Sequence, residues 1–189
     1  GVWTLIKSIT VSNDSTISFV DGASDVVLDS TYPIYVFKFI NIDQTSGTYV
    51  NFLFNGSTDT GSNYNVTKTS SAFRASQNES DDTQLAYQAS QDLKQSTGFQ
   101  EISHEIKSDA DGAASGELRI FGISSTTFVK HYISTVNAMQ TNPGSMIYYI
   151  AGYMNTTSAV DAFQFKMSSG NINAGKIKLY GLKDSAWVE

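Results

Sequence analysis

The chain has 189 residues, a formal net charge of −6, a pI near 4.8 and no cysteine. An acidic chain lacks the basic footprint that offsets phosphate repulsion, so we expect no nucleic-acid partner. The absence of cysteine excludes disulfides, thiolate metal sites and cysteine nucleophiles.

Two further properties bound the fold. Hydrophobic residues make up 40% of the chain, enough for the core of a single domain that we expect to span residues 1–189. No long apolar run occurs, so we expect no membrane insertion. Residues 1–7 lack the charged-then-apolar pattern of a signal peptide, which leaves the compartment open.

Alternation of apolar and polar residues predicts strands from the start of the chain. In the opening strand we expect Trp3, Leu5, Ile9 and Val11 to share one face. A short alternating segment over 17–19 follows, bounded by turn residues. These patterns indicate two strands, each with one face against a core.

The next two segments read as more deeply buried strands. The run 34–42 is apolar on both faces, which predicts a central position in a sheet. After a Ser-Gly turn, Val50, Phe52 and Phe54 share one face of the following strand. Both segments are expected to contribute aromatic side chains to the core.

The middle of the chain gives weaker signals. Residues 55–84 are dominated by Ser, Thr, Asn, Asp and Gly, which predicts loops with short strands around 64–67 and 72–75. A helix over 85–95 is an open alternative, although its apolar spacing is poor. A further loop is expected over 108–116.

Sheet patterns return in the last third of the chain. A long strand is expected over 128–136, and Ile147, Tyr149, Ala151 and Tyr153 form another alternating set. The stretch 160–182 gives the clearest signal, since apolar residues alternate on both sides of a Ser-Ser-Gly-Asn loop.

These segments together predict about ten strands separated by turns, without a repeated βα pattern. The expected fold class is all-β: an antiparallel two-sheet β-sandwich, and more specifically a jelly roll. No internal repeat and no linker is found in the sequence. Small acidic β-sheet modules of this kind typically serve as binding or structural proteins rather than as enzymes.

Four blocks resemble a known family: T-L-I-K-S-I-T-V-S-N-D-S-T-I-S-F-V-D-G at 4–22, D-V-V-L-D-S-T-Y at 25–32, S-S-T-T-F-V-K-H-Y at 124–132 and T-S-A-V-D-A-F-Q-F-K-M-S-S-G-N-I-N-A-G-K-I-K-L-Y-G at 157–181. In this order they resemble the small structural proteins of tailed bacteriophages, especially marine phages of cyanobacteria and other aquatic bacteria. The blocks frame nearly the whole chain, whereas residues 56–115 match less closely.

The resemblance implies a virion component, described in the family as head decoration, cement or tail-fibre protein, without a catalytic motif. We therefore expect a non-enzymatic structural protein, a capsid decoration or cement protein on the outer surface of the virion, made in the host bacterial cytoplasm. Its expected partners are its own copies, as a homotrimer, and other virion proteins such as the major capsid or tail proteins. The alternatives are a tail-fibre or receptor-binding module for a host surface glycan and a carbohydrate-active enzyme.

The two histidines are the first residues to test for chemistry. His104 lies between Glu101 and Glu105, and histidine beside carboxylates can bind metal or sense pH. A solvated surface histidine is the simpler interpretation. His131 falls on the face shared by Val129 and Ile133, where a packed or edge histidine is expected rather than a general base.

The acidic clusters are candidates for calcium binding or for ordinary turns. Asp109, Asp111 and Glu117 surround a glycine as in a calcium loop, but the full ligand pattern is missing, so an ordinary turn is expected. The segment 79–82 is interpreted likewise. Paired acids for glycoside hydrolysis cannot be assigned, because none of the central glutamates carries a motif. No catalytic, cofactor-binding or metal residue is assigned, and no cofactor is expected.

Aromatic and basic residues suggest contact surfaces. Tyr148, Tyr149 and Tyr153, with Trp187 near the end, allow a platform for sugar rings, but core or subunit-interface tyrosines are the favoured interpretation. Outward-facing contact candidates are Lys130, Lys176, Lys178 and Tyr180.

Overall fold

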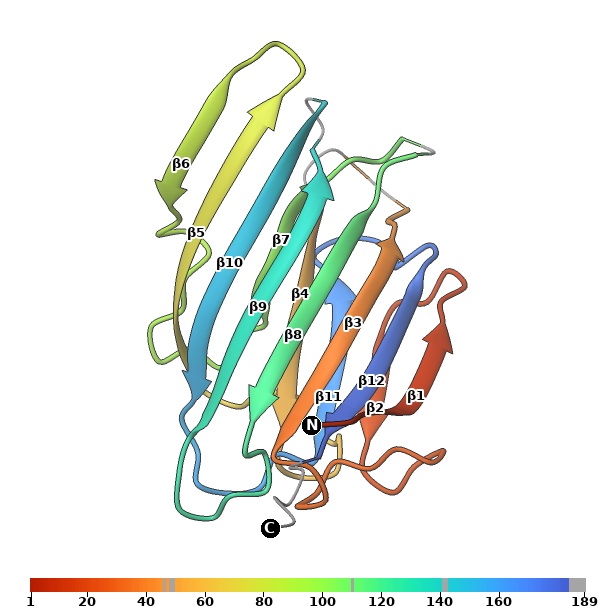
Figure 1. Cartoon of the computed structure of the whole chain (residues 1–189), viewed down its shortest axis with the longest axis vertical. Helices are drawn as coiled ribbons and strands as arrows, with labels where there is room; N and C mark the ends of the chain where they lie inside the picture. The colour runs from red at the N-terminus through yellow and green to blue at the C-terminus, as the bar shows by residue number, and fades with distance from the viewer. Residues whose placement is uncertain (46, 48–49, 110, 141–142, 184–189) are drawn as a thin grey trace.

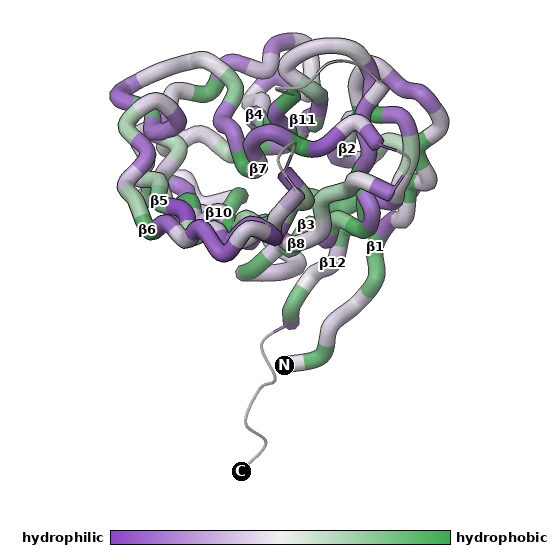
Figure 2. Tube along the Cα trace, turned by 90° about the horizontal axis from the view of Figure 1, so that it is seen from above, coloured by the Kyte–Doolittle hydropathy of each residue, from purple (hydrophilic) through white to green (hydrophobic). Residues whose placement is uncertain are grey.

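The computed structural model describes residues 1–45, 47, 50–109, 111–140 and 143–183. These residues form twelve strands and no helix, arranged in two antiparallel sheets that face each other (Figure 1 and Figure 2). The expected all-β, antiparallel two-sheet β-sandwich is confirmed. No described segment is a helix long and apolar enough to cross a lipid bilayer.

The larger sheet contains eight strands in the order β1-β12-β3-β8-β9-β10-β5-β6, and the smaller sheet contains four in the order β2-β11-β4-β7. The strands in chain order are β1 (Trp3–Thr10), β2 (Ile17–Val20), β3 (Ile34–Ile42), β4 (Val50–Ser57), β5 (Lys68–Asn78), β6 (Thr83–Tyr87), β7 (Gln100–Ile106), β8 (Ala114–Phe121), β9 (Lys130–Met139), β10 (Gly144–Met154), β11 (Ala162–Met167) and β12 (Lys176–Leu182).

Eight of these strands are divided equally between the two sheets. Strands β1, β3, β8 and β12 lie in the larger sheet, while β2, β4, β7 and β11 lie in the smaller one. The other four strands, β9, β10, β5 and β6, continue the larger sheet beyond β8; we call them the extension. In Figure 1 the extension occupies one side of the molecule, with β6 outermost.

The core between the sheets is aromatic. Phe37 of β3 packs edge-to-face against Phe19, Phe163 and Phe165, with ring centroids 5.2, 5.4 and 4.9 Å away. All four rings are fully buried. Burial of each ring contributes about 1.5–3 kcal/mol, and each edge-to-face pair adds about 0.5–1.5 kcal/mol. The expected central position of residues 34–42 is confirmed, because β3 pairs with both β12 and β8.

The opening strand corrects one expectation. The pairing of β1 with β12 shifts register between Leu5 and Lys7, which marks a β-bulge. The extra residue interrupts the alternation, so Trp3 and Leu5 face solvent (42% and 50% exposed) while Ile9 and Val11 pack on the core. The expectation of one shared face was wrong, because period-two alternation assumes an uninterrupted ladder.

The middle of the chain holds more sheet than expected. Within the segment 55–84, residues 68–78 form β5, an eleven-residue strand that pairs with β10 along its whole length and with β6 on its other side. It extends the short strand expected around 72–75, whereas the one expected around 64–67 does not form. The helix considered over 85–95 does not form, since residues 83–87 are β6 and turns follow. Composition misled here because β5 and β6 carry polar side chains that the smaller sheet leaves uncovered.

Candidate functional site

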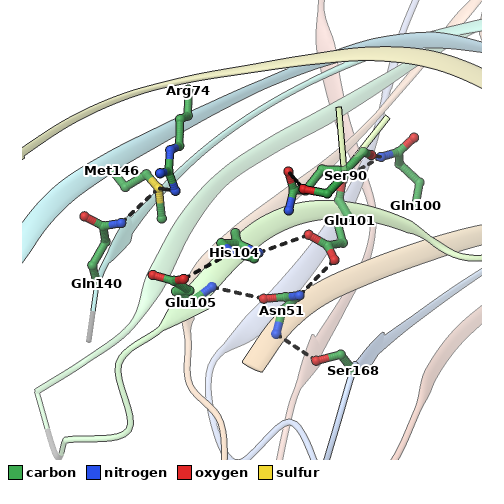
Figure 3. Close-up of polar contacts among 11 residues, drawn as sticks. Asn51, Arg74, Ser90, Gln100, Glu101, His104, Glu105, Gln140, Met146 and Ser168 are labelled. Atoms are coloured by element: carbon green, nitrogen blue, oxygen red, sulfur yellow. Dashed lines mark hydrogen bonds and ion pairs between the residues drawn. The ribbon is translucent and has the colours of Figure 1, made fainter. Parts of the chain in front are cut away.

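A polar cluster lies on β7, at the edge of the smaller sheet (Figure 3). His104 Nδ1 lies 3.2 Å from Glu101 Oε2, and His104 Nε2 lies 3.2 Å from Glu105 Oε1. The expectation of a solvated surface histidine was wrong, since the His104 side chain is only 19% exposed and both ring nitrogens contact carboxylates. The structure therefore brings together the three residues that the sequence places side by side.

Local strand geometry produces this cluster. The β4–β7 pairing shifts register on both sides of Phe52, and Glu105 adopts a positive φ of 52°. Bulges re-aim side chains at sheet edges, which lets one imidazole reach glutamates on both sides. Asn51 of β4 completes the network: its Nδ2 donates to Glu101 Oε1 at 2.8 Å, and its Oδ1 accepts from the Glu105 backbone N–H at 3.1 Å.

The cluster continues toward the larger sheet. The His104 ring lies 5.9 Å from the ring of Tyr148 on β10, and Tyr148 pairs in register with Arg74 on β5. Burial raises the pKa of Tyr148 to about 12, and the nearby Arg74 charge offsets part of that rise. Arg74 Nη1 and Gln140 Nε2 both contact the Met146 sulfur, at 3.6 and 3.1 Å. Polar contacts tie β7 to the extension further along the strand, where Ser70 and Tyr132 donate to Gln100 Oε1 at 2.6 and 3.1 Å.

The acidic loops do not converge on one site. Asp109 Oδ2 lies 2.6 Å from Lys107 Nζ, whereas Glu117 lies on β8 and contacts Lys38 and Arg119. In the segment 79–82 the carboxylate of Asp82 accepts from the Asn78 amide at 3.0 Å. Within the described part of the chain, no group of three His, Cys, Asp or Glu side chains is placed to hold a metal ion.

The outer face of the larger sheet is the second candidate site. Strand register defines which side chains of the extension point away from the smaller sheet. Among the described residues of β9, β10, β5 and β6, none of these outward side chains is Asp, Glu, Lys or Arg; we call this surface the uncharged half. It consists of His131, Ile133, Thr135, Asn137, Met139, Ser145, Ile147, Tyr149, Ala151, Tyr153, Thr69, Ser71, Phe73, Ala75, Gln77, Thr83, Leu85 and Tyr87.

The uncharged half carries an exposed aromatic pair. Phe73 and Tyr149 stack with centroids 4.8 Å apart and ring planes 15° apart, and their exposed fractions are 44% and 37%. Tyr87 lies opposite Phe73 in the β5–β6 ladder. Of the tyrosines singled out in the sequence, Tyr149 and Tyr153 point outward, whereas Tyr148 points into the core. Trp187 lies outside the described residues.

The other half of the same face is different. Its outward side chains on β1, β12, β3 and β8 include five charged groups, and we call it the charged half. Lys178 pairs in register with Lys38, Lys38 pairs with Glu117, and Arg119 Nη2 lies 2.5 Å from Glu117 Oε1. The outward positions expected for Lys176, Lys178 and Tyr180 fit this arrangement, because they lie opposite Ile40, Lys38 and Val36 on β3.

Lys130 is a correction to the expected contact residues. Its side chain is fully buried, and its Nζ donates to the carbonyl oxygens of Ser125, Phe128 and Thr156 at 2.6, 3.1 and 3.1 Å. Lys130 pairs in register with the buried Met154, so its side chain points inward and its hydrogen bonds hold the loop before β9. Burial lowers the pKa of Lys130.

Lys68 is buried in a similar place. Lys68 and Lys130 pair with the same residue, Met154, from opposite sides of β10. Lys68 Nζ donates to Asn55 Oδ1 and to the Val66 carbonyl oxygen. Burial lowers the pKa of Lys68 to about 7. The cations of β5 and β9 therefore lie on the inner side of the extension.

The sequence interpretation missed Leu85 and Tyr87 because their segment was assigned to a loop or a helix, and it placed Phe73 in a short strand without giving it a contact role. A usable signal was present, since Leu85 and Tyr87 alternate with polar or small residues as a strand requires. The partners of His104 on other strands left no sequence signal. Comparisons of the chain with family models, curated proteins and solved structures find no match.

Proposed function

We propose that this chain is a non-enzymatic structural protein on the outer surface of a bacteriophage virion, where it acts as a head decoration or cement protein. The observation that carries the proposal is the uncharged half of the outer face. Although the chain is acidic, this continuous surface carries no charged side chain and includes exposed aromatic rings. Its composition matches the core of a protein interface, where charged residues are depleted and aromatic residues enriched.

The order of the strands supports a jelly-roll interpretation. In each sheet, strands from the two ends of the chain alternate: β1-β12-β3-β8 in the larger and β2-β11-β4-β7 in the smaller. Jelly rolls recur in viral capsid proteins, a likeness at the level of fold alone. The sequence blocks that resemble phage structural proteins cover β2, β11 and most of β1 and β12, which are four of these eight strands, and one block reaches the start of β9.

Docking through the uncharged half has a simple physical basis. Covering apolar and aromatic side chains is favourable by about 25 cal/mol per Å², and no ionised side chain of that surface has to lose its hydration. Many copies on a repeating lattice would add avidity to a moderate single contact. The homotrimer expected from the sequence stays a prediction, and the mass of the free protein in solution decides between a trimer and a dimer.

Imaging of particles tests the location. Phage particles are incubated with a gold-labelled antibody against this chain and examined by negative-stain microscopy. Label distributed over the head is the expected result. Label confined to the tail would contradict decoration and favour a receptor-binding role, and unlabelled particles beside a positive immunoblot of purified chain would contradict a virion-surface location.

The stacked pair of Phe73 and Tyr149 favours a second candidate function, recognition of a host surface glycan. Flat aromatic platforms stack on the apolar faces of sugar rings. A hollow of about 520 Å³ near the other end of the same face is lined partly by Asn137 and Ser145, whose polar groups can bind hydroxyls. Saturation-transfer NMR with host polysaccharide should show contact that Tyr149→Ala abolishes, without turnover of the sugar.

A further inference from the structure

The two sheets have four edge strands among the described residues: β1 and β6 in the larger sheet, β2 and β7 in the smaller one. An edge strand presents unpaired backbone groups that can pair with another chain, and proteins block such pairing with bulges, charges, prolines or short strands.

Three of the edges carry a blocking feature. β1 has the bulge between Leu5 and Lys7, and Lys7 Nζ donates to the Ser24 carbonyl oxygen at 2.7 Å. β7 has register shifts and displays Glu101 and Glu105. β2 is only four residues long. Each of these features opposes regular pairing with a further strand.

β6 has no bulge and no charged side chain, although it is only one residue longer than β2. Its five residues, T-Q-L-A-Y, include no charge and no proline, and its pairing with β5 runs without a register shift. Leu85, at its centre, is 76% exposed, and Tyr87 is 58% exposed. In Figure 1 β6 is the outermost strand, and β5 is its one neighbour within the described part of the chain.

Hydrogen-bond parity shows which groups β6 offers. The Asn78 N–H donates to the Asp82 carbonyl at 3.1 Å and the Gln88 N–H donates to the Ala72 carbonyl at 2.8 Å. In an antiparallel ladder, bonded and non-bonded pairs alternate. Gln84 and Ala86 therefore direct their N–H and C=O groups toward β5, while the backbone groups of Thr83, Leu85 and Tyr87 point away from the sheet.

We propose that β6 is a self-association edge, which pairs antiparallel with β6 of a second copy of this chain. A twofold axis at Leu85 places Leu85 opposite Leu85 and Thr83 opposite Tyr87 of the other copy. Each outward N–H then meets an outward C=O, so the two larger sheets continue into one. The Tyr87 carbonyl also accepts from Gln88 Nε2 at 3.2 Å, which leaves its second lone pair for the other copy. Such an isologous contact is self-complementary, as a twofold dimer requires.

Charge and surface continuity favour a second copy as the occupant. Each chain carries a net charge of −6, but β6 brings no charged side chain to the contact. The carboxylates that flank β6 accept internal hydrogen bonds: Asp81 from Gln77 at 3.1 Å, Asp82 from Asn78 at 3.0 Å and Asp92 from the Tyr87 hydroxyl at 2.6 Å. Pairing also joins the two uncharged halves across the axis, because Leu85 and Tyr87 are part of each.

One substitution tests the backbone pairing directly. Leu85→Pro removes an N–H that points away from β5, so the β5–β6 bonds of the monomer are kept. In sedimentation equilibrium we expect the wild-type chain to form dimers and Leu85→Pro to weaken them by about tenfold or more. Phe128→Ser is the matched control: Phe128 is 72% exposed but lies outside β6, so this variant should dimerise like wild type.

Residue-resolved hydrogen exchange of the wild-type chain gives a second readout, independent of whether the proline variant folds. Raising the protein concentration should slow exchange of the Thr83, Leu85 and Tyr87 amides, while Gln84 and Ala86 stay protected at every concentration. A wild-type chain that stays monomeric, or exchange unaffected by concentration, would overturn the proposal. So would a trimer or dimer that Leu85→Pro leaves intact, because another surface would then carry the association. The proposal does not depend on a virion location.

Discussion

The charged and uncharged halves of one sheet face differ in where they keep their cations. On the charged half, Lys38, Lys176 and Lys178 point outward. In the extension, Lys68 and Lys130 are fully buried against carbonyl and amide oxygens. Burying a lysine costs free energy that an exposed position avoids. The difference teaches that the extension keeps its outer face uncharged at some cost, which fits a surface meant to be covered.

The buried lysine gives the largest expected effect on stability. Burial lowers the pKa of Lys68 from 10.5 to about 7 in the folded chain. Between these values the unfolded chain binds more protons, so stability rises with pH, and the penalty is complete below pH 7. We expect a gain of about 3 kcal/mol between pH 7 and about 9.5, below the range where tyrosines ionise.

Urea unfolding across this pH range measures the gain, and Lys68→Met should remove most of it. Lys178→Met, on the charged half, should leave the slope unchanged. If the free energy of unfolding of wild type and of Lys68→Met depended on pH in the same way, Lys68 would not carry a buried charge. The two halves would then not differ in the cost of placing their lysines.

Charge placed on the uncharged half should strongly weaken docking. Tyr149→Lys would bury an unpaired ammonium in the contact, and we expect binding to particles lacking the protein to fall by about a hundredfold or more. Lys178→Glu, on the charged half, should change binding less than about threefold. Co-sedimentation with particles measures both variants. Equal losses would show that the two halves do not differ in function.

The aromatic stack of the uncharged half should contribute modestly to folding. A double-mutant cycle of Phe73→Ala and Tyr149→Ala is expected to give a coupling energy of about 1 kcal/mol. Denaturant unfolding of the two single variants and the double variant measures it. A coupling near zero would mean that the rings are held apart in solution and are free to receive a partner.

The smallest effect is expected on the charged half. Glu117 pairs with Arg119 at 2.5 Å and with Lys38 at 3.8 Å, but exposed pairs contribute less than about 1 kcal/mol. Glu117→Gln should therefore lower stability only slightly, and the loss should shrink further in high salt. A loss of several kcal/mol in the free energy of unfolding would show that these ion pairs are shielded from solvent. The charged half would then not be the solvated surface that we contrast with the uncharged half.

Much of the fold was predictable from residue alternation alone. The run 34–42 is apolar on both faces and is a central strand, and the segments around Phe52 and Phe165 supply the aromatic core. The failures have specific causes. The bulge in β1 breaks alternation without any sequence mark, and β5 is polar because its outer face is wet and its inner face is only partly covered.

The candidate sites were less predictable, because they depend on contacts between distant strands. The sequence shows His104 next to two glutamates, but it does not show that Asn51 and Tyr148 enclose the group. Likewise, Tyr149 and Phe73 lie far apart in the chain, and only the pairing of β10 with β5 stacks them.

The sequence by itself determined the class of fold and the aromatic core. Apolar residues at every second position predict strands with one apolar face, and such strands bury that face by packing as sheets. Tertiary structure alone decided which faces of the strands in the extension are covered. The smaller sheet packs over only part of the larger one. The register of β10 then places Tyr148 in the core and the next residue, Tyr149, on the surface. Register and coverage arise from long-range pairing, which local patterns do not encode.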